Sequence, residues 1–198
     1  MKSWFRRKED PVERLLELMA QGNEEAAITW LVKHPACADR SGAAGLWPVS
    51  AAVFKGQESL LHALLKQGAY PDRINPDGST PLMAAILSQA PRLADLLLTH
   101  GSNVHATDEF GATPLMYAVR LPSVEISKRL LTDGAELGHR DREGDTPLMY
   151  AAAASQIEQV RLLLEAGADP AARNFDGFQA QDKAYHAAVQ ALLQKKLR

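Results

Sequence analysis

Five columns of residues recur in this chain at a fixed interval of 33 positions. One holds proline (Pro48, Pro81, Pro114, Pro147), two hold glycine (Gly45, Gly78, Gly111, Gly144, Gly177; Gly68, Gly101, Gly134, Gly167), one holds alanine (Ala52, Ala85, Ala118, Ala151, Ala184) and one holds a Leu-Leu pair that begins at Leu64, Leu97, Leu130 and Leu163. A period of this length indicates a row of stacked units, each of which contacts its neighbours, and not one central core.

The interval that starts at Asp108 shows how one unit folds. Asp108 and Gly111 favour a tight turn, because aspartate accepts hydrogen bonds from nearby backbone N–H groups and glycine tolerates a positive φ. Thr113 is expected to be an N-cap, and Pro114 suits the first helical position, where its missing N–H costs nothing. The pattern predicts a short helix that ends near Leu121, because the next residue is proline.

A second helix is predicted in the same unit from about residue 123 to residue 133. Its apolar positions follow helical spacing: Val124, Ile126, Leu130 and Leu131. Gly134 ends the helix, and an extended segment leads to the next turn. Neither helix can bury its apolar face alone, but stacked neighbours can. The predicted fold class is therefore all-α, a solenoid of helix–turn–helix units with short β-turn finger loops.

These units resemble the ankyrin repeat. Three copies of Gly-x-Thr-Pro-Leu-Met-x-Ala begin at Gly78, Gly111 and Gly144, and a Leu-Leu pair followed by Gly-Ala or Gly-Ser comes later in each unit. The resemblance divides the chain into a tail (1–9), a degenerate N-terminal capping repeat (10–41), four repeats (42–74, 75–107, 108–140, 141–173) and a C-terminal capping repeat (174–198). Gln179 and Gln181 in the last unit are the polar replacements expected where a terminal face meets water.

The chain departs from the family pattern at three places. Trp47 replaces the usual threonine in the first of the four repeats. Methionine follows Thr-Pro-Leu where the family usually has a histidine that bonds between repeats, so apolar packing is expected to replace that bond. The glycine between the two helices survives only as Gly56, and its equivalents are Gln89, Pro122 and Ser155.

Composition argues against several classes of function. The chain has 22 Lys and Arg against 24 Asp and Glu, a net charge of −2, whereas a broad nucleic-acid footprint needs a basic excess. No stretch approaches the roughly 20 apolar residues of a membrane helix, so stable membrane insertion is not expected. The basic and aromatic tail around Trp4 and Phe5 is interpreted as a frayed terminus, with contact to a membrane surface or a partner as the alternative.

The search for reactive groups predicts no catalytic site, no cofactor and no metal centre. The six histidines include no pair at the spacing of a metal-binding helix. His105 and His139 fall in successive finger loops and could approach each other, although two solvated side chains are the simpler interpretation. Cys37, the single cysteine, is expected to be a buried apolar residue. It allows no internal disulfide, which favours a reducing, cytoplasmic location.

The resemblance implies that the finger loops and the inner helix face bind a partner protein. The candidate partner-binding residues are Glu109, Phe110, Tyr117, Arg120, Arg140, Arg142, Glu143, Asp145, Tyr150, Arg173 and Phe175. Exposed aromatic and arginine side chains are the residue types that dominate interfaces. The alternative is a solvated face with ion pairs inside each unit, for instance between Arg142 and Glu143 or Asp145.

A second exposed column runs along the first helices, at Phe54, Leu87, Arg120 and Ala153. Tyr117 and Tyr150 belong to a neighbouring column that is usually apolar. They are expected to pack between adjacent first helices, with their hydroxyls toward the groove.

The function predicted from these features is a non-enzymatic module that binds one protein partner and is a monomer when unbound. By fold-level analogy, one concrete version is an inhibitor or immunity protein that neutralises its partner. A scaffold or adaptor in a larger assembly is the alternative, and Phe110 and Phe175 at turn tips argue mildly against it. An enzyme or a metal-binding protein is the least favoured reading.

Overall fold

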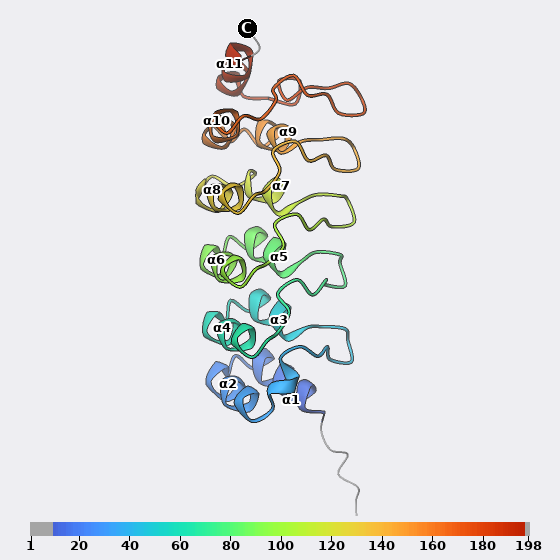
Figure 1. Ribbon diagram of the computed structural model, residues 1–198, viewed down its shortest axis with the longest axis vertical. Coiled ribbons are helices and arrows are strands. Elements are labelled where there is room, and N and C mark those ends of the chain that lie inside the picture. Colours follow the sequence, from blue (N-terminus) through green and yellow to red (C-terminus); the bar gives the residue numbers. More distant parts are fainter. Residues whose placement is uncertain (1–9, 197–198) are drawn as a thin grey trace, which may run out of the picture.

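The computed structural model describes residues 10–196, which contain eleven α-helices, one 3-10 turn and no strand. Figure 1 shows the helices in two columns, with loops that project to one side of the stack. The inner column, next to the loops, holds α1 (Pro11–Ala20), α3 (Pro48–Phe54), α5 (Pro81–Leu87), α7 (Pro114–Ala118) and α9 (Pro147–Ala153). The outer column holds α2 (Glu24–Lys33), α4 (Glu58–Lys66), α6 (Pro91–Thr99), α8 (Glu125–Thr132), α10 (Ile157–Glu165) and α11 (Ala187–Lys196), and η1 (Pro35–Cys37) follows α2. The all-α solenoid expected from the 33-residue period is confirmed.

The inner helices start as the sequence predicts. Proline occupies the first turn of each one, and the threonine before it caps the helix in three units. The Thr113 hydroxyl accepts from the Met116 N–H at 3.5 Å, and the Thr146 hydroxyl accepts from the Met149 N–H at 3.4 Å. Trp47 provides no side-chain cap for α3.

The methionines that replace the family's histidine do more than fill space. The Thr113 backbone N–H donates to Met116 Sδ, and the Thr146 N–H donates to Met149 Sδ, each at 3.5 Å. Both methionines are also fully buried. The expectation of apolar packing alone was therefore incomplete, because sulfur, a weak acceptor, closes the first turn of the helix.

The turn between the two helices tolerates the loss of glycine at two positions and changes shape at a third. Gln89 and Ser155 adopt the left-handed conformation of Gly56, with φ of 53° and 57° against 68°. Proline cannot adopt a positive φ. At Pro122 the backbone therefore takes another path, and α7 ends at Ala118, earlier than the predicted Leu121.

The unwound segment after α7 is supported from the next unit. Gln159 occupies the place of the core residues Leu60 and Leu93 and is buried. Its Nε2 donates to the carbonyls of Ala118, Leu121 and Ser123, at 3.3, 3.0 and 2.8 Å. A cavity of about 140 Å³ adjoins the same segment, where it meets α5 and α6. The structure therefore leaves a cavity at the join between the units 75–107 and 108–140.

The core is a ladder of leucines between the two columns. The first leucine of each pair is fully buried: Leu64, Leu97, Leu130 and Leu163. Burying a leucine side chain contributes about 1.5–3 kcal/mol. The same side chain therefore stabilises every unit, including the one with the shortened α7.

The two ends differ from the units between them. Gly22, with φ of 73°, turns the chain between α1 and α2 one residue out of phase with Gly56, so the sequence prediction missed it. In the last unit the inner helix is reduced to a turn, in which Asp182 accepts from the Gln179 N–H at 2.8 Å. The predicted tail at 1–9 lies outside the described residues.

Candidate functional site

Four finger loops connect an outer helix to the next inner one, at residues 34–47, 67–80, 100–113 and 133–146, and a fifth loop, at 166–186, leads from α10 to α11. Side chains stabilise their tips at one recurring position. Asp141 Oδ1 accepts from the N–H groups of Glu143 and Asp145, at 2.9 and 2.8 Å. Asp108 holds its loop in the same way, and so does Asn174. Asp108, Asp141 and Asn174 stand 33 positions apart and so form another column of the repeat. The sequence prediction identified the turn role only for Asp108.

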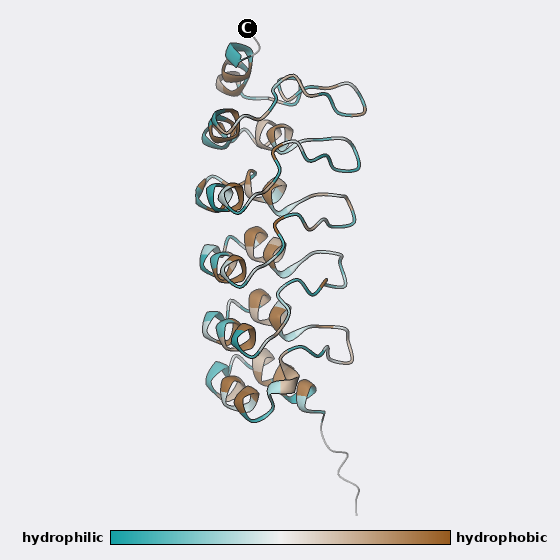
Figure 2. Ribbon diagram, viewed as in Figure 1, coloured by the Kyte–Doolittle hydropathy of each residue, from teal (hydrophilic) through white to brown (hydrophobic). Residues whose placement is uncertain are grey.

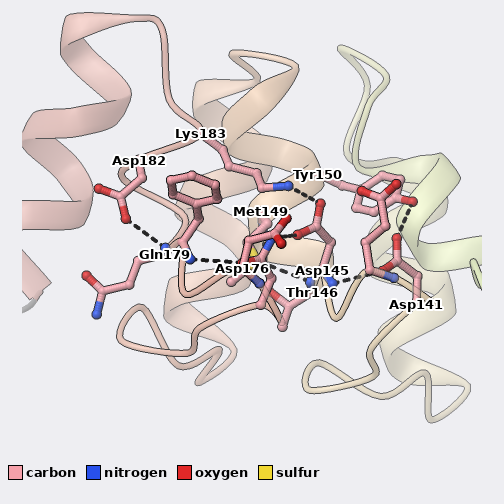
Figure 3. A network of polar contacts seen from close by, with 12 residues as sticks. Asp141, Asp145, Thr146, Met149, Tyr150, Asp176, Gln179, Asp182 and Lys183 are labelled. Atoms are coloured by element: carbon pink, nitrogen blue, oxygen red, sulfur yellow. Dashed lines mark hydrogen bonds and ion pairs between the residues drawn. The ribbon is translucent and has the colours of Figure 1, made fainter.

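Tyr117 and Tyr150 attach two of these loops to their inner helices. The Tyr150 hydroxyl donates to Asp141 Oδ2 at 2.7 Å (Figure 3), and the Tyr117 hydroxyl donates to Asp108 Oδ2. Burial, and then the bond to Asp108, raises the pKa of Tyr117 to about 12, and the pKa of Tyr150 is raised for the matching reasons. Both hydroxyls therefore keep their protons at neutral pH. They tie the loops to the inner helices.

The last three tips are joined to each other through their backbones. The Arg142 N–H donates to the Phe110 carbonyl at 2.9 Å, and the Phe175 N–H donates to the Glu143 carbonyl at 3.1 Å. Gly144 makes the second approach possible, because a Cβ there would lie 2.8 Å from the Phe175 nitrogen. The tips at 108–111, 141–144 and 174–177 therefore form one rigid row.

The first finger loops are joined through side chains instead. Asp39 accepts from the Tyr70 N–H at 3.1 Å and pairs with Arg73, whose hydrogen bond lowers the pKa of the Asp39 carboxyl. The Arg73 guanidinium also lies over the Trp47 ring, 4.5 Å from its centre. In the next loop Asp72 accepts from the Asn103 N–H.

The structure places most of the predicted residues on the surface. Phe110 and Phe175, at two of the tips, are 62% and 71% exposed. Four charged residues are exposed beside them: Glu109, Arg140, Arg142 and Glu143. Arg173 is exposed as well, and its guanidinium donates to the Gly177 carbonyl at 2.6 Å, while Arg140 donates to the Arg173 carbonyl. These two arginines therefore also brace the loops.

Asp145 is the exception. It is buried and pairs with Lys183 (Figure 3). It also accepts from Asn174 Nδ2 at 2.8 Å, so its carboxylate binds the last unit to the unit before it. We therefore leave it out of the exposed surface. The suggested pair of Arg142 with Glu143 or Asp145 is not present among residues 10–196.

A depression of about 320 Å³ opens on the inner helices beside Arg120. Its wall includes Arg120, Tyr150, Lys183 and the end of α9. Toward the other end of the same face, Phe54 and Leu87 are 53% and 52% exposed. Sequence analysis placed these two residues in the exposed column but did not select them.

Two of the side chains considered for reactivity, His139 and Cys37, make contacts within the fold. His139 Nε2 lies 2.9 Å from the Gly111 carbonyl oxygen. Cys37 is buried as expected, and burial raises the pKa of its thiol. Across residues 10–196 no three His, Cys, Asp or Glu side chains gather as a set of metal ligands. None of the helices in that range combines the length and apolar character needed to cross a bilayer.

A family model for ankyrin repeats (3 copies) matches the chain over residues 15–108 and 90–174. The chain belongs to the ankyrin-repeat family. Ankyrin repeats are protein–protein interaction modules and are generally non-enzymatic. No curated protein matches the chain. The family therefore accounts for the stack and its general role, and the exposed residues of this chain are what can select a partner.

Proposed function

We propose that this ankyrin-repeat protein binds one protein partner through its finger tips and inner helix face, and that it inhibits the partner by covering part of its surface. The rigid row of tips carries the proposal. Phe110 and Phe175 project from tips that are both bonded to the tip between them. Tyr117 and Tyr150 tie the first two of these three loops to their inner helices. A large apolar side chain held in a fixed position loses little conformational freedom on binding, which favours affinity.

The sharpest test is the double variant Phe110→Ala with Arg142→Ala. Both side chains are exposed, so we expect an unchanged fold and a partner affinity lowered at least about tenfold, the scale of losing one interface hot spot. The wild-type chain would first be used to capture and identify the partner. Affinity would then be measured with the purified pair, and circular dichroism would check the fold.

Val32→Ala is the matched control, because Val32 is 64% exposed on the outer helix α2. It should bind like the wild type. Equal affinity of the double variant and the wild type would contradict the assignment of the surface. The inhibitory role is tested separately, by assaying the partner's own activity with and without the chain; unchanged activity in the saturated complex would contradict inhibition and leave binding intact.

A further inference from the structure

The inner face changes chemical character along the stack. The same position of successive units holds Phe54 at the end of α3, Leu87 at the end of α5, and Arg120 two residues after the end of α7. The two apolar side chains are each about half exposed, and Ile74, in the finger loop that leads into α5, is 63% exposed. Figure 2 shows strongly hydrophobic residues on α3 and α5 and a paler α9. One end of this face therefore exposes apolar surface area that a partner can bury.

The other end offers a positive charge without a counterion. Arg120 is exposed and makes no ion pair with any residue in the range 10–196. The depression beside it is lined by two cations, Arg120 and Lys183, and by one carboxylate, Asp145. Asp145 already pairs with Lys183. The charge that is left over is positive, so a carboxylate is the group that complements the depression.

We propose that the inner face binds a single continuous partner segment with apolar residues over Phe54 and Leu87 and one aspartate or glutamate at Arg120. This assignment rests on the proposed function, because it names the kind of segment that the same face takes. Apolar burial supplies affinity at one end, and the charge pair fixes the direction and register of the segment at the other.

The geometry also sets the spacing within the segment. Packed helices lie about 8–10 Å apart, so consecutive units present Phe54, Leu87 and Arg120 at steps of that size. A helical segment rises 1.5 Å per residue and would meet successive units with about every seventh residue. A polyproline II segment rises about 3.1 Å per residue with three residues per turn and would meet them with every third. Either way, the acidic residue stands one step beyond the second apolar residue.

A displayed library of random peptides tests the proposal without knowledge of the partner. Peptides about 20 residues long span three units even if they are helical. The library would be selected in parallel on the wild-type chain and on three variants: Arg120→Glu, Phe54→Ser with Leu87→Ser, and Lys66→Glu. Lys66 is exposed on the outer helix α4, so its variant changes the net charge as Arg120→Glu does but away from the inner face.

We expect the wild type and Lys66→Glu to enrich the same peptides, with two apolar residues and an acidic residue at a fixed spacing. Arg120→Glu should replace the acidic residue by lysine or arginine and bind the wild-type peptides at least about tenfold more weakly. The double serine variant should lose the apolar residues from its selection.

The possible failures separate the two proposals. Peptides that need Phe54 and Leu87 but show no acidic preference, or that bind Arg120→Glu equally well, would overturn the carboxylate assignment and leave partner binding intact. A library that yields no peptide dependent on the inner face would also overturn the inference, while the affinity test on the captured partner decides the proposed function.

Discussion

The units 42–107 and 108–173 share one core but present different surfaces. In the first pair, Phe54 and Leu87 expose apolar area, and the finger loops are linked by the side chains of Asp72 and of Asp39, which belongs to the capping repeat before them. In the second pair, Tyr117 and Tyr150 tie loops to helices, and the loop tips bond to each other through the backbone. A 33-residue repeat therefore fixes the scaffold and leaves loop rigidity to be set unit by unit.

The difference depends on two columns that vary together within the chain. The loop-capping residue is Asp108 or Asp141 in the two units whose inner helix carries a tyrosine nine positions later. The same position in the unit before them holds Asn75, whose buried Oδ1 accepts no hydrogen bond within residues 10–196, and the residue nine positions later is Ala84. A carboxylate can accept from the loop N–H groups with one oxygen and from the tyrosine hydroxyl with the other, whereas an amide has a single acceptor oxygen.

Core leucine substitutions should have the largest effect on stability, and this effect should be the same in the units 42–107 and 108–173. Leu97→Ala and Leu130→Ala remove fully buried side chains from the same column, so each should lower the free energy of unfolding by about 2–5 kcal/mol through cavity formation. Chemical denaturation of both variants measures this. An unchanged midpoint for Leu130→Ala would mean that the register of α8 is wrong.

Glycine-to-alanine substitutions in the finger loops should destabilise the two pairs of units by different amounts. Gly78 and Gly144 have φ of 79° and 80°, so alanine at either costs about 1–2 kcal/mol. A Cβ at Gly144 would also strike Phe175, whereas at Gly78 the nearest atom is 3.5 Å away. We therefore expect Gly144→Ala to cost about 1–3 kcal/mol more than Gly78→Ala. Thermal unfolding of the two variants compares them, and equal losses would contradict the rigid row of tips.

A smaller effect is expected from the tyrosine bond. Tyr150→Phe removes the hydroxyl that donates to Asp141 and should cost about 1 kcal/mol. A double-mutant cycle with Asp141→Asn, which keeps an acceptor for the loop, isolates the pair and should give a coupling above about 0.5 kcal/mol. Tyr185→Phe is the control, because Tyr185 is 88% exposed. Additive losses in the cycle would show that the bond does not stabilise the loop.

The tyrosine pairs should have no effect on pH dependence near neutrality and a visible one in alkali. Folding raises the pKa of Tyr117 from about 10 to about 12, so its contribution is complete below pH 10 and is lost as pH rises through about 12. Ultraviolet absorbance titration should show a late ionisation step that Tyr117→Phe removes. A variant with an unchanged titration curve would place that step on another residue.

Much of the fold could be predicted because its causes are local and periodic. Pro114 and Thr113 define a helix start from two adjacent residues, and the leucine pairs define the buried face. The early end of α7 could be predicted only in part. Pro122 indicated a break in the helix, but the unwound segment is also bonded by Gln159, which lies in another unit. The bonds to the sulfur of Met116 and Met149 follow from helix-start geometry that the sequence pattern does not contain.

The candidate surface was predictable to a similar degree. Period and turn chemistry placed Phe110 and Phe175 at loop tips, where the structure has them. The burial of Asp145 was not predictable, because its partner Lys183 lies 38 residues away in a unit whose inner helix is missing. The exposure of Phe54 and Leu87 was open to prediction, since aromatic and apolar side chains stood in a column already recognised as exposed.

The unwound segment at Pro122 makes the array mechanically uneven. Missing packing lowers the free-energy cost of local opening, and a cavity lies beside Ile126, where the unwound segment meets α5 and α6. Under partial denaturation we expect the stack to open at this join, between the unit that holds Leu87 and the unit that holds Arg120. A ligand that reaches from Leu87 to Arg120 would contact both units. Its binding would therefore stabilise this join against opening.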